Sequence, residues 1–151
     1  MTTQLLFMLI LHVFSGLIGV IFSYATLMEL VRHNYSLPYL RRTSVGAVIL
    51  YLLAWLSGGY YYVTYYGTTV KPVILAGAHP FAHSFFLEVK EHLFLLLPFM
   101  AITSATFFWY TNEEGKIDER LRGSLITLVA MTTIIGICIA LAGVVTSGAV
   151  K

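Results

Sequence analysis

The sequence predicts an all-α integral membrane protein in which four antiparallel transmembrane helices form an up-down-up-down bundle. The chain has 151 residues, of which 58% are hydrophobic and 11% are charged, whereas an average soluble domain is roughly 25% charged. Its mean hydropathy is +0.83. Four apolar stretches reach the length of about 20 residues that a helix needs to cross the hydrocarbon core of a bilayer. The connections are short, so we expect residues 1–151 to form a single transmembrane domain.

Composition excludes several other classes of protein. Disorder, collagen and disulfide scaffolds do not fit, because the chain is apolar and contains a single cysteine, Cys138. One cysteine also excludes dithiol chemistry. The net charge is +2, and the charged residues gather in two short loops instead of on one face. We therefore expect no nucleic-acid partner.

The predicted spans cover about residues 4–30, 45–66, 82–110 and 122–149. No Lys or Arg precedes the first span, and its apolar run is about twice the length of a signal-peptide core, so we expect it to remain in the protein. Arg32-His33-Asn34 closes it, and Pro38 prevents its continuation. Glu29 is expected to pair with Arg32 or with a basic residue of the following loop. Gly67 is expected to end the second span.

The third span begins after Ala78-His79-Pro80, a pattern typical of a helix start because proline suits the first helical position. Asn112-Glu113-Glu114-Gly115 is expected to end it. Asp118 and Glu119 then supply the negative charge that stabilises the start of the fourth helix.

Basic residues predict the orientation of the spans. Six of the nine Lys and Arg residues lie in the first and third connections, namely Arg32, Arg41, Arg42, Lys116, Arg120 and Arg122. Because basic loops stay on the cytoplasmic side, we expect both termini and the connection from Gly67 to Ser84 to face outward. The predicted location is the cytoplasmic membrane of a bacterium or archaeon.

Two histidines lie inside predicted spans, where polar side chains are costly and mark candidate functional sites. His12 follows Gln4 by eight residues, which places it about 12 Å deep at 1.5 Å per residue. His92 follows Phe85 by seven residues and lies about 10 Å deep from the same side. The two side chains are therefore predicted to share a depth in the outer leaflet.

Small residues follow His12 at helical spacing, as Ser15, Gly16, Gly19 and Ser23. The fourth span has a similar strip, made by Gly136, Ala140, Gly143 and Ser147. Such strips usually allow membrane helices to approach each other. A flat porphyrin ring beside a ligand histidine would need the same free space, so both interpretations remain open.

Aromatic side chains gather at the end of the second span, as Tyr60, Tyr61, Tyr62, Tyr65 and Tyr66. An aromatic belt at the membrane interface is one explanation. Five tyrosines around one helix also predict that some turn inward, where Tyr61 or Tyr65 would line a cofactor or quinone site. Gly58 and Gly59 would allow a backbone or ligand to approach closely.

The leading hypothesis is a b-type haem protein that transfers electrons near the outer leaflet. His12 and His92 would be the axial ligands, with Gly16 and Gly19 beside the ring and Lys90 near the haem propionates. The partners would be the lipid bilayer and a redox protein or quinone. No catalytic residue is predicted.

Two alternatives compete with haem binding. One is a direct copper, zinc or iron site, built from His12, His79, His83, Glu88, Glu91 and His92. The other is a non-catalytic subunit of a larger membrane complex or a homo-oligomer. In that case the glycine strips are partner interfaces, and His12 is a packed histidine bonded to a carbonyl of a neighbouring helix.

Overall fold

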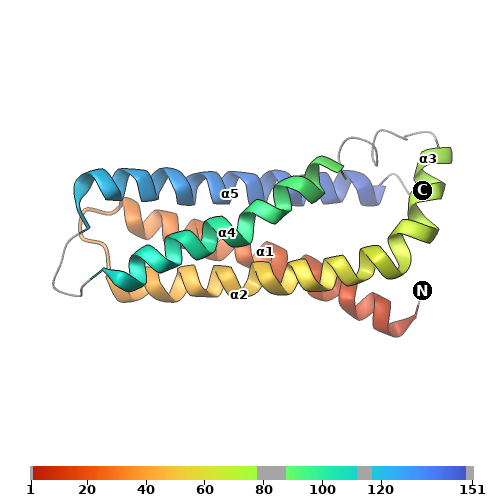
Figure 1. The fold of residues 1–151 in the computed structure, drawn as a ribbon, viewed down its shortest axis with the longest axis horizontal. Coiled ribbons are helices and arrows are strands. Elements are labelled where there is room, and N and C mark those ends of the chain that lie inside the picture. Colours follow the sequence, from red (N-terminus) through yellow and green to blue (C-terminus); the bar gives the residue numbers. More distant parts are fainter. Residues whose placement is uncertain (1, 78–87, 112–116, 149–151) are drawn as a thin grey trace.

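The protein was analysed as a computed structural model, which describes residues 2–77, 88–111 and 117–148, without the side chains of residues 88–91. The described part is helical (Figure 1). It contains four helices that are long and apolar enough to cross a membrane: Thr3–Val31, Leu37–Ala76, His92–Tyr110 and Glu119–Gly148. This confirms the all-helical class and the four candidate spans predicted from hydropathy.

The first helix, α1, spans Thr3–Val31 and begins at Thr2, whose side chain accepts a hydrogen bond from the backbone N–H of Leu5. Its last turn contains Glu29, which pairs with Arg32 at 3.0 Å and accepts the Ser36 backbone N–H at 2.6 Å. The predicted Glu29–Arg32 pair is therefore confirmed. The same carboxylate also ties the end of α1 to the start of the next helix.

The second helix, α2, spans Leu37–Tyr61 and has Pro38 in its first turn. Proline there stops α1 and suits the start of α2, because the missing N–H would have no helical partner. The helix begins eight residues before the predicted apolar span, which started at residue 45. Its first turns are polar in part, but Leu37 and Leu40 are buried and hold them against the bundle.

Helical structure continues past the predicted stop at Gly67. The segment η1, a π-helix over Tyr62–Val70, contains Gly67 and leads into the short helix α3 over Lys71–Ala76. The prediction that Gly67 ends the helix is wrong, because the wider π-helical turn keeps the backbone bonded through the glycine. Aromatic contacts four residues apart support this turn: the rings of Tyr62 and Tyr66 stack at 5.4 Å.

The last two long helices are α4, Glu88–Tyr110, with Pro98 in its interior, and α5, Glu119–Gly148, with Glu119 in its first turn. The acidic start of α5 agrees with the sequence prediction. The start of α1 and the end of α5 lie toward the same end of the molecule (Figure 1).

The core runs along the axis that the four long helices share. One cluster contains Leu30, Leu40, Phe108 and Leu125, one residue from each of these helices. A second cluster, around Tyr51 of α2, includes Leu97 and Ala101 of α4 and Ile139 of α5. The bundle also exposes large apolar side chains on α1, α2, α4 and α5, a surface suited to lipid or a partner and costly in water.

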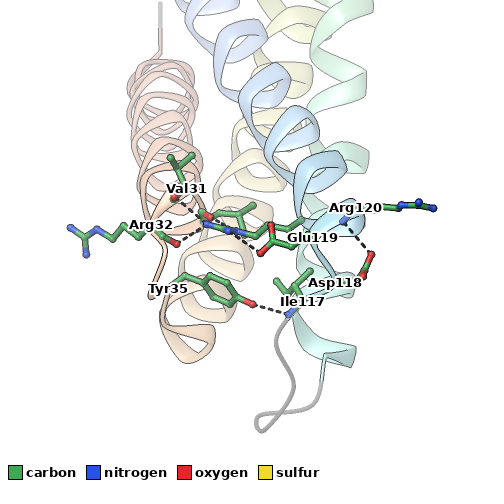
Figure 2. A network of polar contacts seen from close by, with 9 residues as sticks. Val31, Arg32, Tyr35, Ile117, Asp118, Glu119 and Arg120 are labelled. Carbon is green, nitrogen blue, oxygen red and sulfur yellow. Dashed lines mark hydrogen bonds and ion pairs between the residues drawn. The ribbon is translucent and has the colours of Figure 1, made fainter.

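The end of the bundle opposite to the start of α1 contains Arg32, Arg41, Arg42 and Arg122, and we call it the basic end. Two of these residues, Arg41 and Arg122, join helices there. Arg122 of α5 donates hydrogen bonds to the carbonyls of Leu30, Val31 and Arg32 at 3.1, 3.1 and 2.7 Å. These carbonyls are the unsatisfied acceptors at the end of α1. Figure 2 shows this network, in which Tyr35 also accepts the Ile117 backbone N–H at 2.7 Å.

Arg41 of α2 performs the same task for α4. Its guanidinium donates to the carbonyls of Phe108 at 3.0 Å and Thr111 at 2.6 Å, and lies 5.8 Å from the centre of the Trp109 ring. Arg122 thus joins the start of α5 to the C-terminal carbonyls of α1, and Arg41 joins the first turns of α2 to those of α4. The charges also suit the partial negative charge of helix C-termini.

Candidate ligand cavity at His12

A cavity of about 340 Å³ lies between α1, α4 and α5. Its walls include His12 and Gly16 of α1, Phe94 of α4, and Gly136 and Gly143 of α5. The volume falls within the range of about 300–1,000 Å³ that small-molecule sites occupy. The lining residues Val13 and Val144 are 46% and 70% exposed, so the cavity reaches the bundle surface between α1 and α5.

His12 is the histidine in this cavity wall, and its ring is held by α2. Its Nδ1 atom donates a hydrogen bond to the carbonyl oxygen of Ala54 at 2.8 Å, because a carbonyl can only accept. In a neutral imidazole this leaves the proton on Nδ1 and the lone pair on Nε2. A bond from one ring nitrogen to a carbonyl is also how proteins orient metal-binding histidines.

Gly58 makes room for the imidazole of His12. A Cβ atom at position 58 would lie near the His12 ring, 2.4 Å from Nδ1 and 2.7 Å from Cε1. No real Cβ sits that close, so Gly58 is needed for the His12–Ala54 bond. A side chain, and not the predicted backbone or ligand, makes the close approach at Gly58, whereas a Cβ at Gly59 would meet nothing within 4 Å.

The part of α4 that contacts His12 is Phe94, not His92. The rings of His12 and Phe94 lie 6.0 Å apart in an edge-to-face arrangement with an interplanar angle of 73°. Two residues along a helix correspond to a rotation of about 200°, so His92 lies on nearly the opposite face from Phe94. His92 is exposed and does not line the cavity. The α4 residue seen against His12 at the cavity is therefore Phe94 and not the predicted axial ligand His92.

The small residues of α1 face another helix for part of their length. A Cβ atom at Gly19 would lie 2.9 Å from the Tyr51 ring, and one at Gly16 would contact Ala54 at 3.9 Å. On α5, a Cβ at Gly136 would lie 2.7 Å from Val20. These contacts fit the helix-packing interpretation of the strips. Gly16, Gly136 and Gly143 also line the cavity, so the strips serve both purposes.

The predicted tyrosines lie away from the cavity walls. Tyr61 and Tyr65 contact each other, with ring centres 5.7 Å apart. Tyr66 does turn inward, where it is buried against Ile74 of α3. The tyrosine that lines the cavity is Tyr51, which sequence analysis did not single out. Its position three residues before Ala54 and seven before Gly58, on the same helix face, is the signal that could have found it.

The other predicted site residues cannot be placed in the same way. His79 and His83 lie outside the described residues, and the side chains of Glu88, Lys90 and Glu91 are not described. In the described parts of the chain, no three His, Cys, Asp or Glu residues gather closely enough to hold a metal ion.

Comparisons with models of protein families, with curated proteins and with solved structures found no match to this chain.

Proposed function

We propose that the protein is a four-span membrane protein that binds a b-type haem in the cavity beside His12 and transfers electrons. The haem iron would alternate between its ferric and ferrous forms, taking one electron from a redox partner protein or quinol and passing it to an acceptor. The observation that carries this proposal is the position of His12. It lines a cavity of about 340 Å³ while Ala54 holds its Nδ1 atom.

Three features of the cavity support a flat, apolar cofactor. Its lining includes glycines of two helices, Gly16 and Gly136, which add no side chain to the cavity. Its opening between Val13 and Val144 leaves room for the edge of a macrocycle to extend beyond the enclosed volume. The tautomer of His12 that donates to Ala54 carries its lone pair on Nε2, the nitrogen that would bind iron.

The second axial ligand that we propose is His92, on the helix that faces His12. In the described packing, the α4 residue whose ring contacts the imidazole is Phe94. Coordination by His92 therefore requires α4 to turn about its axis when haem binds, bringing His92 inward and moving Phe94 away. Lys90, two residues earlier, is the proposed partner of the propionates.

The architecture that goes with this proposal is an up-down-up-down bundle in the cytoplasmic membrane of a bacterium or archaeon. The basic end would face the cytoplasm, because Arg32, Arg41 and Arg122 gather there. The His12 cavity would then lie in the outer leaflet, close to the aqueous phase in which a redox partner protein would dock.

The absorption spectrum of the protein purified from its membrane tests the proposal. We expect a Soret band and, after reduction with dithionite, sharp α and β bands typical of low-spin haem, with about one haem per chain by the pyridine haemochrome assay. A colourless protein from cells supplied with haem precursor would contradict haem binding.

A subunit without a cofactor is the second candidate, and one observation favours it. The bond from His12 to Ala54 and the contact with Phe94 already give partners to a half-buried histidine between helices. In that case the exposed apolar faces would meet other subunits of a membrane complex or further copies of the chain. A colourless protein that co-purifies with a defined partner would support this candidate.

The third candidate is a direct copper, zinc or iron site that uses His12, His79, His83, Glu88, Glu91 and His92. Replacing both His79 and His83 with Ala separates it from haem binding. The double variant should lose bound metal if these side chains are ligands, and it should keep an unchanged haem spectrum if the iron is held by His12 and His92.

A further inference from the structure

A second, much smaller pocket lies at the centre of the bundle and is lined by hydroxyl groups. Its volume is about 10 Å³, and its walls include Ser23 and Thr26 of α1, Ser44 of α2, Ser104 of α4 and Thr132 of α5. All four long helices thus contribute a hydroxyl. Each of these five residues is at most 4% exposed, so the pocket is closed to bulk solvent.

We propose that this pocket binds one water molecule that joins the four helices. A volume of about 10 Å³ is close to the least that one water molecule needs. A buried water also requires two to four polar partners, and the pocket provides hydroxyl oxygens on every side. The apolar lining residues, such as Ala47 and Ala101, restrict the space to one molecule.

Three of the hydroxyls are arranged to accept hydrogen bonds from the water. Each already donates its own proton to a carbonyl of the same helix: Ser44 to Arg41 at 3.1 Å, Ser104 to Ala101 at 3.0 Å and Thr132 to Leu128 at 2.8 Å. A hydroxyl has one proton but two lone pairs. Each of these three hydroxyls can therefore only accept a hydrogen bond from the pocket. A water molecule has two protons and donates to two of them.

The fourth hydroxyl, Ser23, is arranged to donate to the water. Its oxygen lies 2.9 Å from the phenol oxygen of Tyr51. When Tyr51 donates in that bond, Ser23 accepts and its own proton is directed elsewhere. The water then accepts one bond from Ser23 and donates two, which gives the three bonds that are typical of a buried water. Thr26 bonds to the carbonyl of Phe22 and to the hydroxyl of Thr43, and the three bonds of the water do not require it.

A monovalent cation fits the pocket less well than water. The described walls contain no carboxylate, so a cation would bring an uncompensated charge into the centre of the bundle, which is costly. The neutral chain from Tyr51 through Ser23 to the water brings no charge into the pocket and gives the water three hydrogen bonds. Because Tyr51 also lines the His12 cavity, this chain connects the pocket with that cavity. The inference does not depend on haem binding.

The direct test is a crystal structure of the full chain grown in a lipidic phase with ordered waters visible. We expect one peak in the pocket, about 2.7–3.0 Å from Ser23 and from two of the three acceptor hydroxyls. The peak should persist when sodium is replaced by choline. An empty pocket in a crystal structure that shows other ordered waters, or a peak that disappears without sodium, would overturn the proposal.

A matched pair of variants provides a second readout. Thr132→Val removes a hydroxyl from the pocket at nearly constant volume, and Thr106→Val removes an exposed hydroxyl with the same 2.8 Å bond to its own helix. We expect the Tm of the Thr132 variant to fall about 2–4 °C further than that of the Thr106 variant, because a methyl group replaces one of the three acceptor hydroxyls beside the buried water. Equal shifts in a pair of folded variants would count against a bound water.

Discussion

The imidazole of His12 and the backbone carbonyl of Ala54 form a 2.8 Å hydrogen bond between α1 and α2. The bond exists because α2 carries glycine at position 58, one turn beyond Ala54, where any side chain would overlap the His12 ring. A pair of small residues on α2 thereby fixes both the position and the tautomer of the histidine. The cavity beside it acquires one oriented polar group in an otherwise mainly apolar wall.

Replacing Gly58 with Ala should destabilise the protein. The new Cβ would lie 2.4 Å from the His12 Nδ1 atom, so α1 and α2 must separate or His12 must leave its position, at a cost of about 1–3 kcal/mol. Gly59→Ala is the matched control, because its Cβ meets nothing within 4 Å. That variant should be neutral or stabilised by up to about 1 kcal/mol. Thermal unfolding in detergent compares the two, and equal Tm values would contradict the assigned contact.

Removing the Arg122 side chain should loosen the basic end. In Arg122→Met, the three carbonyls of Leu30, Val31 and Arg32 lose their donor, which we expect to cost about 1–3 kcal/mol. Arg120→Met, on an exposed position of the same helix, changes the same charge and serves as the control. Unfolding in denaturant measures both. If the two variants lose the same stability, the effect is one of charge and not of helix capping.

Single cysteines test the orientation in the membrane. In a Cys138→Ser background, Thr68→Cys should react with a membrane-impermeant thiol reagent on intact cells, while Asn34→Cys should react only with a permeant one. Both positions are exposed in the structure, so differences in labelling report the side of the membrane. The reverse pattern would show that the distribution of basic residues does not set the orientation.

Variants at His92 and Phe94 test whether α4 turns about its axis when haem binds, as coordination by His92 requires. His92→Ala should convert six-coordinate low-spin haem into a five-coordinate species, since one axial ligand is lost. Adding Phe94→His to that variant places an imidazole where the described packing contacts His12. We expect this to restore part of the low-spin spectrum. An unchanged spectrum in His92→Ala would exclude His92 as a ligand.

The sequence was sufficient to predict the long helices but not how they face each other. Hydropathy is summed over many residues, so the apolar stretches predicted the four spans. Pro38 and Glu119 predicted helix starts, because proline suits the first turn and negative charge stabilises it. The facing of His92 depends on how α4 is rotated in the bundle, which its sequence alone leaves open. Counting residues from the start of the span predicted how deep His92 lies. The contact of Phe94 with His12 shows which face of α4 is turned toward α1.

Contacts between distant residues were also beyond sequence reasoning. Arg41 and Arg122 counted only as loop charges, because the carbonyls that they bind lie 67–70 and 90–92 residues away in the chain. The π-helical segment after Tyr61 has no simple sequence signature. Gly67, which usually ends a helix, lies inside this segment because the following turns remain helical.

Haem content of the His12→Ala variant is the most direct test of the proposed function. The variant should lose nearly all bound haem, because it removes the ligand that Ala54 holds at the cavity wall. His33→Ala removes an exposed histidine at the basic end and should retain about one haem per chain. The pyridine haemochrome assay on both purified variants, each checked for folding by circular dichroism, gives the comparison. Full haem content in folded His12→Ala would contradict the account.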